Sequence, residues 1–116
     1  MNKKDKKIML FFESSPFADD RTAEGLRMGL GLTICNDNVS VAFADNAINA
    51  LRKTVPGNIP DVVKPLEMLC EMKKTIYAVK SKNMRFDEKD SPYTVTVIEK
   101  DKFFELLTDS DVVITC

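Results

Sequence analysis

Apolar residues form an almost unbroken run near each end of the chain. The run at residues 8–12 follows two lysines and stops at Glu13, and a second run occupies residues 112–114. Such runs are typical of buried strands in a parallel sheet, because helices cover both faces of the sheet. The irregular segment after the carboxyl end of a strand is where α/β proteins place ligands. We therefore expect two buried strands, and a candidate ligand-binding segment at residues 14–20.

Between these two runs, segments with a strand pattern alternate with segments with a helix pattern. Further strands are predicted at residues 38–44, 75–79 and 94–99, and helices at residues 20–35, 45–53, 61–74 and 101–107. Residues 80–92 combine mixed charge with few apolar side chains, so we expect an irregular loop or a short irregular helix there. Strands that alternate with helices predict an α/β protein built as a three-layer α/β/α sandwich with right-handed crossovers.

The segment at residues 20–35 has two competing patterns. Its apolar residues alternate as in a strand from Leu26 to Ile34, and each of its three glycines costs a helix about 1 kcal/mol relative to alanine. A helix is favoured because Asp19 or Asp20 can cap it and no hairpin signal precedes it. Glycines also permit close contact with a sheet or with another subunit. A helix that is apolar on more than one side indicates a homo-oligomer.

Composition limits the class of protein. The chain has 116 residues, which we interpret as one domain, and 17 basic against 18 acidic residues leave a net charge of −1. This balance does not favour nucleic-acid binding. No apolar stretch approaches the roughly 18 residues of a membrane span, and a signal-peptide core is missing at the N-terminus, so we expect a cytoplasmic protein without membrane contact.

Histidine is absent from the chain, and three cysteines lie far apart in the sequence. The lack of histidine excludes the usual imidazole base, a Ser-His or Cys-His dyad within one chain, and histidine-ligated zinc. An odd number of separated cysteines argues against a disulfide framework and fits a reducing compartment. We expect no metal site and no cofactor.

Each cysteine meets only part of the requirement for a reactive thiol, which needs exposure and a positive environment. Cys70 shares a helix side with Leu66 and Leu69 and is interpreted as buried. Cys35 lies beside an aspartate, which opposes thiolate formation. Cys116 is the last residue, and its reach makes it a weak candidate nucleophile, with Cys70 as the other.

Polar residues follow three of the predicted strands. They are Glu13, Ser14 and Ser15 after the first, Asp45 and Asn46 after the second, and Lys80 and Ser81 after the third. In a parallel sheet these segments lie at one edge, so together they form a candidate ligand-binding mouth. For Ser14, Ser15 and Asn46 taken one by one, turn and cap hydrogen bonds are the slightly favoured interpretation. Lys80 is the strongest candidate, because it can attract a persulfide, a thiosulfate or a phosphate.

Three segments of the chain resemble the DsrE/DsrF/TusC-type (DsrE-like) sulfur-relay proteins. They are the strand, turn and helix of residues 8–32 with Ala23-Glu24-Gly25-Leu26-Arg27-Met28, the strand end Ala44-Asp45-Asn46-Ala47, and the closing pattern from Val95 through Phe103-Phe104-Glu105-Leu106-Leu107 to Thr115. The resemblance covers almost the whole chain. It implies a five-stranded, largely parallel sheet, a cytoplasmic location, assembly into trimers or hexamers, and sulfur-relay proteins as partners.

The chain departs from this family at one position. In sulfur-carrying members a cysteine follows the strand that corresponds to residues 75–79 and accepts sulfur as a persulfide, whereas Lys80 and Ser81 stand here. We therefore expect an accessory or binding subunit of sulfur relay or sulfur metabolism rather than an enzyme. Two alternatives stay open: a sulfurtransferase that uses a displaced cysteine, Cys116 or Cys70, and a protein that binds a small anion or a nucleotide.

Overall fold

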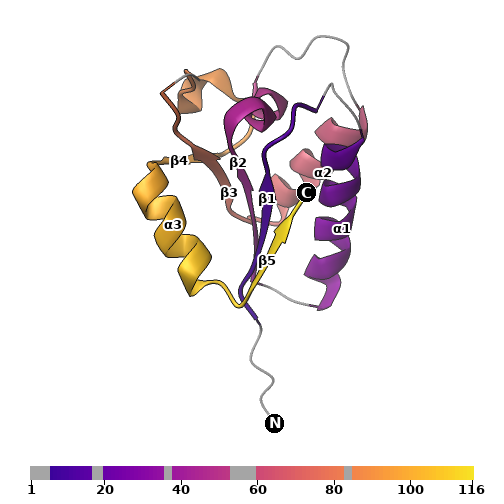
Figure 1. Cartoon of the computed structure of the whole chain (residues 1–116). Coiled ribbons are helices and arrows are strands. Elements are labelled where there is room, and N and C mark those ends of the chain that lie inside the picture. Colours follow the sequence, from indigo (N-terminus) through magenta and orange to yellow (C-terminus); the bar gives the residue numbers. More distant parts are fainter. Residues whose placement is uncertain (1–5, 17–19, 36–37, 53–59, 83–84) are drawn as a thin grey trace.

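The computed structural model describes residues 6–16, 20–35, 38–52, 60–82 and 85–116, which form one sheet with helices on both faces (Figure 1). In chain order the elements are β1 (Ile8–Phe12), α1 (Arg21–Cys35), β2 (Val39–Phe43), the 3-10 helix η1 (Asp45–Leu51), α2 (Pro60–Glu71), β3 (Ile76–Val79), the 3-10 helix η2 (Glu88–Asp90), β4 (Thr96–Ile98), α3 (Lys100–Asp109) and β5 (Val112–Thr115). The alternation expected from the sequence is confirmed.

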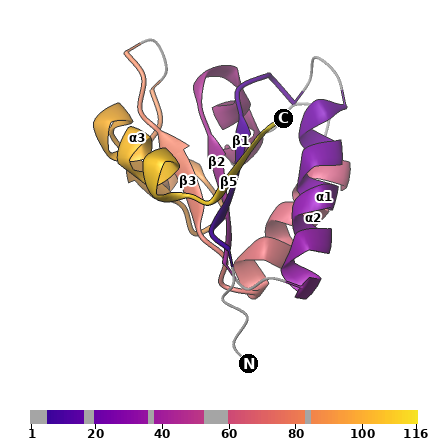
Figure 2. The ribbon, with the colours of Figure 1, turned by 60° about the horizontal axis from the view of Figure 1, so that its bottom comes forward.

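The sheet has five strands in the order β4-β3-β2-β1-β5. All four neighbouring pairs are parallel, and Ile8 pairs with Val39 on one side and with Val112 on the other. Helices α1 and α2 cover one face of the sheet and α3 covers the other (Figure 2). The three-layer α/β/α sandwich is therefore confirmed, and the carboxyl ends of all five strands meet at one edge.

Two apolar cores fill the spaces between the layers. The larger core lies under α1 and α2, where Leu10 and Phe12 of β1 pack with Leu26 of α1 and Leu66 of α2. The smaller core lies under α3 and joins Met9, Ala42, Ala44, Val79 and Phe103. Successive residues of β1 thus point to opposite faces, as the period of a strand requires. The smaller core ends at the carboxyl edge, where the candidate mouth was expected.

Two glycines of α1 lie where this helix, whose apolar residues alternate as in a strand, packs against the sheet. Gly25 and Gly29 are buried, and the nearest side-chain atoms to a Cβ at Gly29 would belong to Leu10 of β1. Gly31 is exposed, and nothing lies near the place of its Cβ. Gly25 and Gly29 therefore let the helix approach its own sheet. The sequence had left open whether these glycines allow close contact with a sheet or with another subunit.

The segment after β2 differs from the expected capped helix at residues 45–53. The 3-10 helix η1 begins at Asp45 and ends at Leu51, its N-cap is Ala44, and no side chain caps it. Asp45 has a φ of 51°, in the left-handed region that aspartate tolerates better than most residues. The cap prediction for Asp45 and Asn46 was wrong because a capping residue needs extended backbone.

At the start of α1, the backbone carbonyl of Asp20 accepts a hydrogen bond from the backbone amide of Glu24 at 2.9 Å. Asp19, the other residue expected to cap this helix, lies outside the described residues.

The segment at residues 80–92 was expected as a loop or a short irregular helix. In its described part, residues 80–82 and 85–92, it contains the three-residue helix η2, in which Asp87 and Asp90 form a capping box. Among the ranges that the structure describes, no helix is long and apolar enough to cross a membrane.

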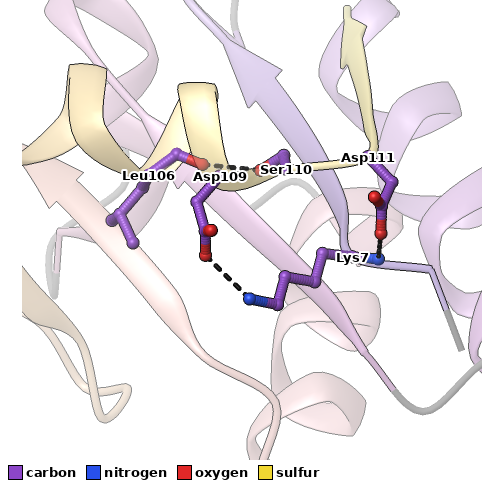
Figure 3. Close-up of polar contacts among 5 residues, drawn as sticks. All are labelled: Lys7, Leu106, Asp109, Ser110 and Asp111. Carbon is purple, nitrogen blue, oxygen red and sulfur yellow. Dashed lines mark hydrogen bonds and ion pairs between the residues drawn. The ribbon is translucent and has the colours of Figure 1, made fainter.

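Lys7 ties the amino ends of β1 and β5 together (Figure 3). Its backbone amide donates to the Asp111 carboxylate at 2.7 Å, and its ammonium pairs with the Asp109 carboxylate at 2.7 Å. The backbone amide of Asp111 donates to the Lys7 carbonyl at 2.8 Å. The short connection from α3 to β5 is thus held at the edge of the sheet opposite the candidate mouth.

This contact makes acid stability depend on Asp109. The hydrogen bond and the charge of Lys7 lower the pKa of Asp109 below its ordinary value of 3.8. The folded chain therefore binds fewer protons than the unfolded chain near and below pH 4, so the stabilisation is present at neutral pH and is lost as the pH falls through the lowered pKa. We expect Asp109→Asn to reduce stability slightly at pH 7 and not at pH 2, in urea unfolding. Glu105→Gln on the same helix is the control, and equal behaviour of both variants would contradict the assignment.

Candidate functional site at the carboxyl edge of the sheet

A cavity of about 190 Å³ opens at the carboxyl ends of β1, β2 and β3, on the face that α3 covers. We call it the carboxyl-edge cavity. It is lined by Phe11, Glu13, Ala44, Asp45, Val79, Lys80, Ser81, Lys100, Phe103, Phe104 and Leu107. Three strand ends and the first two turns of α3 therefore contribute to one site.

The inner part of the cavity is apolar. Val79 and Phe103 are buried, and the rings of Phe11 and Phe103 lie 4.8 Å apart between their centroids. The Phe104 ring is 59% exposed and forms part of the rim. Water competes weakly for polar interactions in such surroundings, so charges at the mouth act more strongly on a bound group than they would in open solvent.

The charged residues of the rim are separated by sign along the sheet. Glu13 follows β1 and Asp45 follows β2, whereas Lys80 follows β3 and Lys100 begins α3 directly after β4. Because the strand order is β4-β3-β2-β1, the two acidic residues follow strands on one side of the cavity and the two lysines follow strands on the other. The left-handed backbone of Asp45 turns the chain sharply at the end of β2 and belongs to this rim.

The basic side of the cavity continues into a second depression, which we call the outer hollow. It measures about 490 Å³ and is lined by Lys80, Ser81, Lys82, Glu99, Lys100 and Asp101. The Lys80 ammonium lies 3.3 Å from the Glu99 carboxylate, and both side chains are mostly exposed. Exposed ion pairs of this kind contribute little and exchange easily with other partners, so Lys80 is able to meet an incoming anion.

The structure brings together four of the seven residues expected at the mouth. Glu13, Asp45, Lys80 and Ser81 line the carboxyl-edge cavity. Ser14 lines a different hollow, on the α1 side of the sheet. Ser15 and Asn46 are not among the described residues that line the carboxyl-edge cavity. Glu13 borders both hollows.

Lys100, Phe103 and Phe104 also line the cavity, although the sequence pattern did not single them out as site residues. For Lys100 a signal was present, because it directly follows the carboxyl end of the fourth predicted strand. The two phenylalanines were taken only as part of a helix pattern. Their place over the sheet edge depends on the path of α3 across the face, which local sequence does not specify.

Cys116 packs against α1 beside this edge. Its backbone amide donates to the Phe11 carbonyl at 2.8 Å, and its Sγ would lie 2.8 Å from a Cβ placed on Gly25. Cys116 lines the hollow of about 570 Å³ that also holds Ser14. Burial raises the pKa of the Cys116 thiol, which lowers the thiolate fraction at neutral pH and therefore its reactivity. In this environment the side chain acts as a packing group.

Cys70 is half-buried in α2 and lines a larger groove of about 850 Å³ between α2 and residues 92–94. Burial raises the pKa of Tyr93 in this groove, with further contributions from Glu67 and Cys70. The one arginine of the groove, Arg52, already binds the protein, since it donates to the Arg85 carbonyl at 2.7 Å and to Asn49 Oδ1 at 3.0 Å. Lys64 is the other basic residue of this groove, and Glu67 and Glu71 also line it.

Cys35 is exposed at the end of α1, where its Sγ contacts the Leu32 carbonyl at 3.6 Å. The three cysteines are unpaired thiols. Within the described residues, no group of three or more cysteine, aspartate or glutamate side chains is placed to hold a metal ion. The chemistry of the candidate site thus rests on ammonium, carboxylate and hydroxyl groups around an aromatic interior.

Comparison with known proteins gives matches of two kinds, to solved structures and to a family model. The crystal structure of the YchN protein from E. coli superposes with a TM-score of 0.73 at 17% sequence identity, and the match covers 96% of this chain and 99% of that one. This likeness shows the fold. The comparison with curated proteins found no significant match. The model of the DsrE/DsrF-like family matches residues 6–116, almost the entire chain, and the protein therefore belongs to the DsrE/DsrF-like family.

Proposed function

We propose that this protein is a cytoplasmic accessory or binding subunit of sulfur relay, which holds an anionic sulfur-bearing group without carrying the sulfur on a cysteine of its own. Family membership supports a protein of the sulfur-relay type. The observation that carries the finer proposal is the lining of the carboxyl-edge cavity. Lys80 and Ser81 follow β3 where, by the resemblance, carrier proteins have their cysteine, and none of the described residues lining the cavity is a cysteine.

The charges at this position suit recognition of an anion. Lys80 and Lys100 supply two ammonium groups at the mouth, and the Ser81 side chain lies in the same wall. Hydrogen bonds from an ammonium group to an anion are stronger than hydrogen bonds between neutral groups. A persulfide or a thiosulfate presents both a negative charge and a polarisable sulfur, and sulfur makes favourable contacts with aromatic rings such as Phe103.

The outer hollow gives a larger partner access to the same lysines. It shares Lys80, Ser81 and Lys100 with the carboxyl-edge cavity and extends away from it past Lys82. A sulfur-relay protein that bears a persulfide on a flexible segment would approach along this hollow. We propose such proteins as partners of the subunit.

Assembly of the subunit into a trimer or hexamer is part of this proposal. Large apolar side chains are exposed on the α1 and α2 layer, including Met28 (41%), Ile34 (87%) and Met68 (49%). Exposed apolar groups of this size on neighbouring helices favour burial against another chain. Light scattering tests the proposal, since a solution mass equal to the 13.1 kDa monomer would contradict it.

The displaced-carrier alternative makes a different prediction for the cysteines. We expect that native protein exposed to a persulfide donor retains no added sulfur on Cys116 or Cys70 in peptide mass spectrometry. We also expect iodoacetamide to alkylate Cys116 more slowly than the exposed Cys35, because burial raises the pKa of the Cys116 thiol. Alkylation in urea is the control, since similar rates for the unfolded chain would show that the fold causes the difference.

The opposite result would identify a carrier. A stable added sulfur on Cys116 or Cys70, absent after that cysteine is replaced with serine, would overturn the accessory role and name the nucleophile. Cys35→Ser is the matched variant that should leave such an adduct in place.

A further inference from the structure

We propose that the carboxyl-edge cavity binds a small α-amino acid in its zwitterionic form, with an apolar or thiol side chain, and that L-cysteine is the representative ligand. This inference rests on the proposed function and narrows it, because it names the chemical class that the cavity accepts. Three properties of the cavity carry it: its size, the separation of its charges and its aromatic interior.

The size of the cavity suits a small ligand. Its volume is about 190 Å³, well below the 490 Å³ of the neighbouring outer hollow. A ligand of about seven heavy atoms, such as cysteine, is small among the ligands that protein cavities hold.

The charges of the rim suit a ligand that carries both signs. Asp45 follows β2 and Lys80 follows β3, and these strands are neighbours in the sheet. Neighbouring strands are spaced by about 4.8 Å, so the acidic and basic sides of the cavity are about one strand spacing apart at their backbones. The ammonium and carboxylate of an amino acid are separated by a similar short distance and can each meet the opposite charge.

An ion of one sign satisfies only half of this rim. A simple anion uses Lys80 and Lys100 and leaves Glu13 and Asp45 unused. A simple cation uses only the two carboxylates. A zwitterion uses both halves, because its ammonium faces the carboxylates while its carboxylate faces the lysines.

The apolar interior of the cavity favours a ligand with an apolar or thiol side chain. Phe103 is 4% exposed, its ring packs against Phe11, and Val79 closes the wall beside them. A charged side chain would lose its hydration there without gaining a partner. A thiol or small alkyl group makes dispersion contacts with the rings, and sulfur gains an additional favourable interaction with their edges.

Calorimetric titration of the full chain tests this inference with three related thiols, under a phosphine reductant. L-cysteine is compared with 3-mercaptopropionate, which lacks the ammonium, and with cysteamine, which lacks the carboxylate. We expect L-cysteine to bind at least tenfold more tightly than either analogue. Equal affinity for L-cysteine and 3-mercaptopropionate, or no binding of L-cysteine, would overturn the zwitterion inference.

Variants of the rim locate the binding site. Asp45→Asn and Lys80→Gln should each weaken L-cysteine binding at least tenfold, and asparagine tolerates the positive φ of position 45. The controls Asp101→Asn and Lys82→Gln make the same charge changes in the outer hollow, outside the cavity. We expect little effect from the controls, and equal weakening by control and rim variants would overturn the assignment.

The same titrations separate this inference from the function on which it rests. If thiosulfate binds through Lys80 and L-cysteine does not bind, the zwitterion inference fails and the anion-binding accessory role stands. If a cysteine of the chain retains persulfide sulfur, the accessory role itself fails, whichever ligand enters the cavity.

Discussion

Replacing Phe12 with alanine should lower the free energy of unfolding by about 3–5 kcal/mol, the range for removing a buried aromatic ring. Phe12 ends β1, is 1% exposed, and stacks on Phe43 of β2 with ring centroids 4.8 Å apart. The truncation leaves a cavity between the sheet and α1 that the helix backbone at Gly25 cannot easily fill. Urea unfolding monitored by circular dichroism measures the change.

The control for this variant is Phe104→Ala. Phe104 carries the same ring but is 59% exposed on α3, so little apolar burial is lost on truncation. We expect a change well below that of Phe12→Ala. Similar losses in both variants would show that the larger core is not centred on the contact between β1 and α1.

Replacing Gly25 with alanine should destabilise the fold although alanine is the better helix former. A Cβ at position 25 would lie 2.5 Å from Phe12 Cε2 and 2.8 Å from Cys116 Sγ, closer than real contacts allow. Forcing such a contact costs about 1–3 kcal/mol, and the helix propensity of alanine offsets up to about 1 kcal/mol of this cost. The ring of Phe12 is held by Phe43 and cannot move away, so we expect a net loss in thermal and urea unfolding.

Gly31→Ala is the matched control on the same helix. Nothing lies within 4 Å of a Cβ at position 31, which is exposed. Alanine there should stabilise the protein by up to about 1 kcal/mol through helix propensity alone. If both glycine variants changed stability in the same direction, the close approach of α1 to β1 would be contradicted.

Much of the fold was predictable because its apolar pattern is local. The run at residues 8–12 became β1, since a strand covered on both faces requires apolar residues at nearly every position. The run at residues 112–114 became the edge strand β5, but the expectation that it is buried was wrong, because Val113 is 43% exposed there. The helix at residues 20–35 was predicted against its own alternating pattern, and the structure shows why this was right. Gly25 and Gly29 lie on the side that faces the sheet, where their small size permits close packing.

The parts that were missed depend on geometry beyond local sequence. Asp45 was expected to cap a helix, but the chain turns through a left-handed residue and Ala44 takes the cap position. For the site, the rule that strand ends meet at one edge correctly brought Glu13, Asp45, Lys80 and Ser81 together. The same rule did not predict that Phe103 and Phe104 line the cavity, because their position depends on the direction in which α3 crosses the sheet.

Amide NMR of the labelled full chain during titration with thiosulfate tests the central claim most directly. If the carboxyl-edge cavity is the binding site, the largest shifts should fall on Lys80, Ser81 and Lys100, and Lys80→Gln should abolish them while Lys82→Gln preserves them. Shifts centred on Cys70 and Tyr93 in the α2 groove, or on Cys116, would contradict the claim. An absence of shifts at thiosulfate concentrations up to the millimolar range would contradict it as well.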